Sequence, residues 1–281
     1  MNEYLGRDYT NEELERLHVL LLDILKEIVR VCDILHLKYF IIGGTAIGAY
    51  FWKGIIPWDD DIDIGMIRKD YERFLHEAPS VLKAGYTLQH FYTEPNTPFY
   101  YAKVRKDDTL FVEESYRDLN IHHGVFIDIF PFDRIPRSGA LEKVQRRIVQ
   151  YFEGSFRRRL MKRFISEGMA KLPYFVRKPL TDFRFALIRL IPRKYFYWRM
   201  TLAQTWFNKK DCEYVNVIKM PLDQIPVKDI DNSRQVEFGG MMVNAPDNME
   251  DYLKHHYPNL NKFPPEEARI NHRPIELSFN E

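Results

Sequence analysis

The segment PWDDDIDIG, residues 57–65, gathers four aspartates within five positions. The alternation of Asp and Ile at its end predicts a strand over residues 61–66, on which residues i and i+2 share a face. Asp61 and Asp63 then point the same way, with their backbones roughly 6–7 Å apart. At an effective dielectric of about 20, their repulsion is on the order of 2.5 kcal/mol. Such crowding requires raised pKa values or a cation, and Mg²⁺ binds one or two carboxylates together with substrate phosphate oxygens.

Two other interpretations of this segment are a calcium-binding loop and a solvated acidic loop. An EF-hand loop starting at Asp59 needs Gly at its sixth position and Glu at its twelfth, but Ile64 and Asp70 stand there. The alternating isoleucines favour a strand over a loop. A divalent-cation site that also engages a phosphate is therefore the preferred interpretation, with a solvated loop as the alternative.

Asp128 is the second candidate, because it interrupts the otherwise apolar run VFIDIF, residues 125–130. A carboxylate in such a strand is costly unless it is paired or binds a metal. The alternative is an Asp that bonds to backbone near a strand end, since Pro131 is expected to close the strand. Beside an Asp-x-Asp strand, Asp128 is a candidate third metal ligand.

Gly43, Gly44 and Thr45 separate a predicted strand, residues 39–42, from a predicted short helix, residues 45–52. Glycines there let a ligand approach the backbone, and the amides at a helix start favour phosphate. The glycine spacing differs from that of a dinucleotide-binding fingerprint, and the Gly-Lys-Ser/Thr of a Walker A loop is missing. Alone, this pattern also fits a plain tight turn. Together with the aspartates, it predicts metal-dependent nucleotidyl or phosphoryl transfer.

The segment IIGGTAIGAYFWKGIIPWDDDIDIGM, residues 41–66, resembles the signature of the LicD-type phosphotransferases, which include the fukutin-related proteins. The similarity continues through YAKVRKDDTLFVEE and HGVFIDIFPFD, and it extends to PPEEARINHR near the end of the chain. The resemblance implies a nucleotidyltransferase-like fold. It also implies transfer of a phospho-linked group, such as phosphocholine or ribitol phosphate, from a CDP-linked donor to a hydroxyl of a cell-surface glycan or glycolipid precursor.

The resemblance also implies roles for individual residues. Asp61, Asp63 and Asp128 are expected to be catalytic and to hold Mg²⁺, as one ion or two, with Mn²⁺ as the alternative metal. The residues expected around the donor are Gly43, Gly44, Thr45, Lys53, Lys103, Arg105 and His272. The alternatives to this function are a catalytically silent, membrane-associated scaffold and a nucleotidyltransferase that acts on a small molecule.

The elements around these residues predict an α/β fold of the mixed α+β type, in which helices flank a mixed sheet. Leu17, Leu21 and Ile24 belong to an apolar stripe with helical spacing over residues 12–36. We expect residues 1–135 to form the nucleotidyltransferase-like core, residues 136–200 a basic helical insertion, and residues 201–281 a segment that completes the active site. Within the insertion, helix breaks are expected at Gly154, Pro173, Pro179 and Pro192.

The charge of the chain is segregated, although 41 Lys and Arg nearly balance 40 Asp and Glu. Residues 141–200 hold 16 basic and 4 acidic residues, interleaved with aromatic ones. This stretch suits an anionic membrane or a polyanionic acceptor. A solvated insertion that pairs with the acidic core is the main alternative, and nucleic acid is the least favoured partner.

Two cysteines without metal-ligand spacing, no signal-peptide pattern and no apolar run of about 20 residues predict a cytoplasmic protein with at most peripheral membrane contact.

Overall fold

The computed structural model describes residues 8–160, 173–219, 224–260, 262–265, 269 and 271–279. The helices are α1 (Asn11–Leu35), α2 (Gly43–Trp52), α3 (Arg68–Glu77), α4 (Gly139–Arg158), α6 (Tyr174–Leu190), α7 (Arg193–Gln204), α8 (Val227–Asp231) and α9 (Met249–His256), with 3₁₀ turns at Ala78–Ser80 and Thr205–Phe207. The first six strands are β1 (Phe40–Ile41), β2 (Asp63–Ile67), β3 (Tyr86–Gln89), β4 (Ala102–Lys106), β5 (Thr109–Val112) and β6 (Phe126–Ile135). The remaining strands are β7 (Tyr214–Asn216), β8 (Ile225–Pro226), β9 (Arg234–Phe238), β10 (Met241–Ala245) and β11 (Glu276–Phe279).

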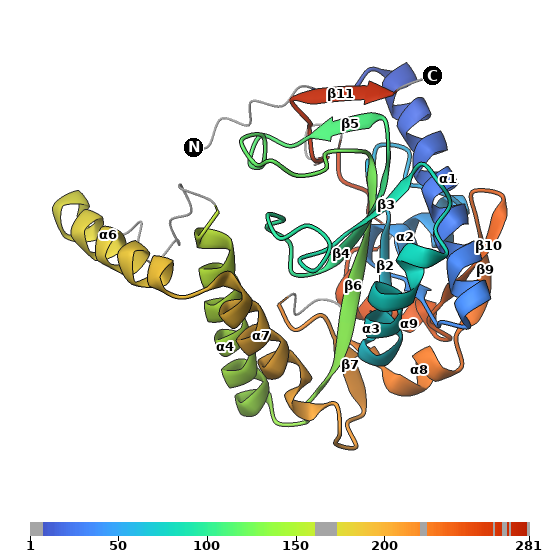
Figure 1. Ribbon diagram of the computed structural model, residues 1–281. Coiled ribbons are helices and arrows are strands. Elements are labelled where there is room, and N and C mark those ends of the chain that lie inside the picture. The colour runs from blue at the N-terminus through green and yellow to red at the C-terminus, as the bar shows by residue number, and fades with distance from the viewer. Residues whose placement is uncertain are drawn as a thin grey trace.

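A mixed sheet in the order β1-β2-β6-β4-β3 forms the centre of the molecule (Figure 1). Strands β2 and β6 run parallel, whereas β4 pairs with β6 in the antiparallel sense. Beyond its pairing with β4, the long strand β6 pairs with β7, which in turn pairs with β8. Two separate antiparallel two-stranded sheets, β9-β10 and β5-β11, lie outside this path. The mixed α/β class predicted from the sequence is confirmed.

Helix α1 covers one face of the sheet and contributes much of the core. Thr10 caps it with a capping box, in which its side chain accepts from the Glu13 amide while the Glu13 carboxylate accepts from the Thr10 amide. Leu17, Leu21 and Ile24, which lie in the predicted stripe, are at most 1% exposed. The apolar periodicity of residues 12–36 therefore predicted both the helix and its buried side.

The expectation that Pro131 closes the strand is wrong, because β6 continues to Ile135. Pro131 lies between Ile129, the last residue of β6 paired with β4, and Asp133, the first paired with β7. A proline is tolerated where one side of a strand lacks a partner, since its missing N–H then removes no ladder hydrogen bond there.

The basic region is helical as expected, but two of the four predicted breaks are wrong. Helix α4 passes through Gly154, and α6 contains Pro179. Pro173 and Pro192 do mark boundaries, as the N-cap residues of α6 and α7. Residues 161–172 of the predicted insertion lie outside the described residues. Among the helices in the described ranges, none is both long enough and apolar enough to cross a membrane.

Gly48 lies where α2 passes closest to the loop that leads to the acidic segment. A Cβ there would lie 2.3 Å from the Gly54 carbonyl oxygen and 3.2 Å from the Ile56 amide nitrogen. Because both neighbours are backbone atoms, we expect Gly48→Ala to lower the free energy of unfolding by about 1–3 kcal/mol, measured by urea denaturation. The control is Gly139→Ala, where a Cβ meets nothing within 4 Å. An equal loss in both variants would contradict this expectation.

Candidate active site

The sheet register brings together two of the predicted metal ligands and a lysine. Asp63 on β2 pairs directly with Asp128 on β6, and Asp128 pairs on its other side with Lys103 on β4. Neighbouring strands lie about 4.8 Å apart, and paired residues point to the same face of a sheet. Asp63, Asp128 and Lys103 therefore form a row across three strands.

Asp61 lies in the loop before β2, because the strand begins at Asp63 rather than at residue 61 as predicted. Thr45 Oγ1 accepts a hydrogen bond from the Asp63 amide at 2.8 Å, so a side chain from the first turn of α2 contacts the first residue of β2. Hydrogen bonding to β6 nevertheless begins one residue before β2, where the Asp128 amide donates to the Ile62 carbonyl at 3.2 Å.

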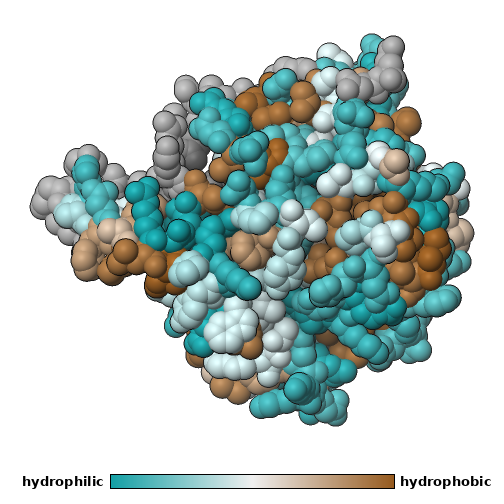
Figure 2. Space-filling model, viewed as in Figure 1, coloured by the Kyte–Doolittle hydropathy of each residue, from teal (hydrophilic) through white to brown (hydrophobic). Residues whose placement is uncertain are grey.

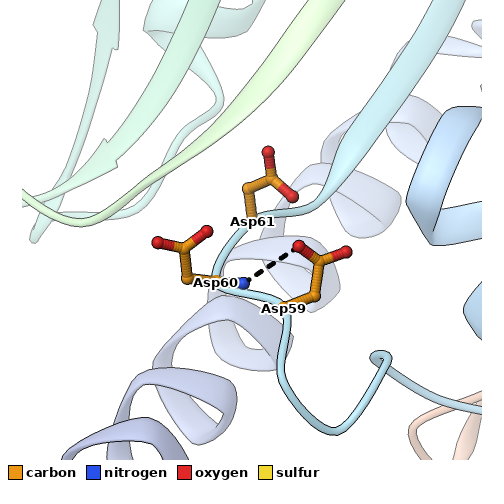
Figure 3. Close-up of side chains that lie close together, drawn as sticks. All are labelled: Asp59, Asp60 and Asp61. Atoms are coloured by element: carbon orange, nitrogen blue, oxygen red, sulfur yellow. Dashed lines mark hydrogen bonds between the residues drawn. The ribbon is translucent and has the colours of Figure 1, made fainter. Parts of the chain in front are cut away.

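Three consecutive acidic side chains leave this loop in different directions (Figure 3). Asp59, Asp60 and Asp61 each offer one carboxylate oxygen within a group whose atoms all lie within 4.8 Å of one another. The Asp60 amide donates to Asp59 Oδ1 at 3.2 Å, which fixes the turn between them. This spacing suits cation binding, although the carboxylate of Asp60 is already bonded to Tyr9 and His272.

Asp60 is the carboxylate held by the protein itself, and its side chain is 1% exposed. It accepts from Tyr9 Oη at 2.5 Å and from the His272 amide at 2.8 Å, and its Oδ1 lies 3.0 Å from His272 Nδ1. The His272 ring also lies 3.9 Å from Asp61 Oδ2. Burial alone would lower the pKa of His272, but the hydrogen bond and charge of Asp60 raise it to about 10. His272 is therefore an imidazolium at neutral pH that joins the C-terminal segment to the acidic loop.

Gly43 and Gly44 lie directly against the carboxylates. A Cβ on Gly44 would lie 2.8 Å from Asp59 Oδ2, and one on Gly43 would lie 3.6 Å from Asp63 Oδ2. Gly43 also has a φ of +55°, which a residue with a side chain rarely adopts. Both glycines belong to the first turn of α2 rather than to a separate turn before it. The N-terminus of a helix thus opens onto the acidic site, as a phosphate-binding arrangement requires.

The crowded carboxylates have raised pKa values. Burial, together with the charges of Asp61 and Asp60, raises the pKa of Asp59 to about 8. Burial, partly offset by His272, raises the pKa of Asp61 to about 6. Burial and the charges of Asp61 and Asp128 also raise the pKa of Asp63. Without a cation, the protein therefore bears an electrostatic cost at this site.

Lys103 and Arg105 are both about 2% exposed. Lys103 Nζ lies 2.6 Å from Asp128 Oδ1 and 3.4 Å from the centroid of the Phe126 ring. Arg105 Nε donates to Gln89 Oε1 at 2.7 Å, and its Nη1 donates to the Gly124 carbonyl at 2.5 Å. Lys103 is thus paired with a carboxylate of the row, whereas Arg105 is hydrogen-bonded to Gln89 and to the backbone of Gly124. Contact of either residue with a nucleotide remains a prediction.

Lys53 lies apart from the other candidates. It follows the C-terminal end of α2, whereas Gly43 and Gly44, at the start of that helix, lie against Asp63 and Asp59. Its side chain is 70% exposed and pairs with Glu237 at 2.9 Å. Its positive φ of +51° and the bond from the Gly239 amide to its carbonyl at 2.7 Å give it a role in ending the helix.

The residues present fit a hard divalent cation. Oxygen ligands from Asp61, Asp63 and Asp128 belong to the chemistry that Mg²⁺ and Mn²⁺ prefer. The raised pKa values of Asp61 and Asp63 have burial and mutual repulsion as causes, and a bound cation would counter the repulsion. Because Gly43 and Gly44 have no side chains, the carboxylates of Asp63 and Asp59 approach the start of α2 closely.

Sequence reasoning missed several partners in this site. Tyr9 holds Asp60, and Tyr252 Oη accepts from the Gly43 amide at 2.9 Å. Neither tyrosine has a local pattern that marks it. Asp59 and Asp60 stood in the acidic run, but nothing in the sequence distinguished Asp60, which is bonded within the protein, from the carboxylates that face the glycines.

Comparison with known proteins agrees with this geometry. Residues 36–174 match the family model described as LicD/FKTN/FKRP, nucleotidyltransferase domain. The chain is 26% identical over 267 residues to the lipopolysaccharide cholinephosphotransferase LicD of Haemophilus influenzae, covering 89% of this chain and 92% of that protein. An uncharacterized protein of Rickettsia typhi is 42% identical over 55 residues, which is 20% of this chain and 18% of the relative.

The carboxylate row, the acidic loop and the glycine-led helix are the candidate site, and they lie within or beside residues 36–174, which match a nucleotidyltransferase domain. The chain belongs to the LicD family and is a LicD-type transferase.

Proposed function

We propose that the protein transfers phosphocholine from CDP-choline to a hydroxyl group of a lipopolysaccharide-type glycan or its lipid-linked precursor, with Mg²⁺ as cofactor. The observation that carries this proposal is the pairing of Asp63 with Asp128 beside the N-terminus of α2. The name of the Haemophilus relative supports the choice of phosphocholine and of a lipopolysaccharide acceptor.

In this reaction, the acceptor oxygen bonds to the phosphorus next to choline, the bond between the two phosphates breaks, and CMP leaves. Asp61, Asp63 and Asp128 would hold Mg²⁺, which neutralises charge that develops on the donor phosphates. The amides of the first turn of α2, apart from that of Gly43, which donates to Tyr252 Oη, would bind a phosphate oxygen. Asp61, outside the strand and 24% exposed, is the carboxylate best positioned to receive the proton of the acceptor hydroxyl.

Ligand-induced stabilisation tests this proposal directly. CDP-choline at about one hundred times its Kd, added with Mg²⁺, should stabilise the protein by about 2.7 kcal/mol, a rise in Tm on the order of 5 °C. Each ligand without the other should produce a smaller rise. A rise with CDP-ribitol but none with CDP-choline would contradict the choice of phosphocholine, and no rise with any CDP-linked ligand would contradict the enzyme as proposed.

We further propose that the protein reaches a lipid-linked acceptor through α4 and α7, from the cytoplasmic side of an anionic membrane. The two helices lie side by side (Figure 1), joined by bonds from Gln145 Nε2 to the carbonyls of Ala203 and Gln204. Their solvent-facing stripes, continued by the following 3₁₀ turn, carry seven large apolar side chains that are 42–57% exposed: Leu141, Val144, Tyr151, Tyr195, Trp198, Leu202 and Trp206. Exposed basic residues flank these stripes at positions 143, 147, 194 and 199.

Helix α6 extends the apolar surface. It projects from the body of the molecule, and apolar residues lie along its side (Figure 2). Phe183, Leu187 and Leu190 are 65%, 48% and 80% exposed. Exposed apolar residues of this number on one part of a protein indicate an interaction surface.

Vesicle binding tests the membrane contact. The protein should cosediment with vesicles that contain phosphatidylglycerol, and less with pure phosphatidylcholine or at high salt, because basic residues act through screened charge. We expect the double variant Trp198→Ser with Leu202→Ser to bind at least about tenfold more weakly, since two apolar side chains no longer enter the lipid. The control is Val19→Ser on α1, where Val19 is 68% exposed. Binding that is equal for both variants would contradict this role.

A further inference from the structure

Four aromatic rings form a cluster beside the acidic loop. Phe51 and Trp52 end α2, Trp58 directly precedes Asp59, and Phe263 comes from the C-terminal segment. Ring centroids lie 4.8 Å apart for Trp52 and Phe263, and 5.1 Å apart for Phe51 and Phe263. The two tryptophan rings lie 5.5 Å apart in an edge-to-face arrangement. We call Phe51, Trp52, Trp58 and Phe263 the aromatic cluster.

The aromatic cluster lies outside the hydrophobic core. Phe263 is 44% exposed, and the other three rings are half-buried. By contrast, Phe40 and Phe132, which also pack edge-to-face, are 1% exposed and lie within the core. Rings that pack on one another while still facing solvent are typical of a ligand-binding surface.

A cation already lies on one of these rings. The guanidinium carbon of Arg269 lies 4.1 Å from the centroid of the Trp58 ring, within the range of a cation–π interaction. Trp58 is followed directly by the acidic loop, in which Asp59, Asp60 and Asp61 place three carboxyl groups close together. Both features favour a positively charged group at the aromatic cluster.

We infer that the aromatic cluster is the subsite for the quaternary ammonium head group of the donor, an inference that rests on the proposed function. A trimethylammonium group has a positive charge, apolar methyl groups and no N–H donor, so aromatic faces satisfy all of its requirements. A primary ammonium or a polyol would need hydrogen-bond acceptors that rings do not supply. Trp58 is one residue from Asp59, so the subsite adjoins the carboxylates that would face the donor phosphates.

Donor selectivity tests this assignment. The affinities for CDP-choline, CDP-ethanolamine and CDP, each with Mg²⁺, are measured by calorimetry for the full-length protein and its variants. We expect Trp52→Leu and Phe263→Leu each to weaken CDP-choline binding by about tenfold and to change the other two affinities by less than twofold. Trp52→Phe, which keeps a ring, should retain most of the selectivity. The control is Tyr92→Leu, where Tyr92 is an aromatic residue 58% exposed outside the donor site and the membrane-contacting helices.

The outcomes separate this inference from the function on which it rests. Equal weakening of all three ligands would overturn it, because the rings would then hold the nucleotide. Unchanged selectivity in a protein that still transfers phosphocholine would overturn the subsite alone. A wild-type protein that binds no CDP-choline would overturn the proposed function, and the subsite with it.

Discussion

Asp63→Asn is expected to lower kcat/KM by about 10²–10³-fold, because a lost metal ligand removes several kcal/mol of transition-state stabilisation. The same variant should be at least as stable as the wild type when no metal is present. Burial and the charges of Asp61 and Asp128 raise the pKa of Asp63, so the neutral Asn relieves repulsion that the folded protein otherwise bears. Steady-state kinetics and metal-free thermal melting measure the two effects.

Asp128→Asn provides the matching contrast. It should lower kcat/KM to a similar extent, but it should also destabilise the protein by about 2–3 kcal/mol, since Lys103 then loses its charged partner 2.6 Å away. Asp118→Asn, at a side chain that is 92% exposed, is the control for both and should change neither quantity. Full activity of Asp63→Asn would contradict the assignment of the metal site.

Asp60→Ala is expected to lower the free energy of unfolding by about 2–3 kcal/mol, because it leaves the Tyr9 hydroxyl and the half-buried imidazolium of His272 without their shared carboxylate. Asp60 is 1% exposed and joins Tyr9 of the N-terminal segment to His272 of the C-terminal segment. Its loss should also lower activity, since His272 lies 3.9 Å from Asp61. Urea denaturation gives the stability, and Asp118→Ala serves as the exposed control.

A double-mutant cycle shows whether the two residues act as one unit. His272→Ala with Asp60→Ala should cost less than the sum of the single variants, because each single variant leaves the other partner unpaired. Additive losses would mean that the 3.0 Å contact between the Asp60 carboxylate and the His272 ring contributes little to folding.

Local patterns predicted the residues of the site better than they predicted its assembly. The alternation around Asp63 and the lone carboxylate of Asp128 marked both residues, because charge and hydropathy along one strand reveal which side chains are unusual. Their direct pairing depends on β2 and β6 being parallel neighbours, which no spacing within either strand specifies. The end of β6 was likewise misjudged at Pro131, since tolerance of proline depends on which partner strands are present.

Contacts between distant segments were the least predictable part. Asp60 and His272 are 212 positions apart, and the sequence indicates neither their hydrogen bond nor the one from the half-buried phenol of Tyr9. Lys53 illustrates the opposite error. It lies close to the acidic segment in sequence, yet its side chain is 70% exposed and pairs with Glu237 of β9. Proximity along the chain is a poor guide to proximity in a folded site.

The central claim is a metal-dependent transfer from CDP-choline. The most direct measurement is mass spectrometry of CMP release from a panel of CDP-linked donors, with a lipopolysaccharide acceptor, with Mg²⁺ and with a chelator. The account predicts CMP together with phosphocholine-modified acceptor from CDP-choline, only with the metal, and at least about a hundredfold more slowly with Asp63→Asn. Product formation that persists in the chelator, or that proceeds at the wild-type rate in Asp63→Asn, would contradict it.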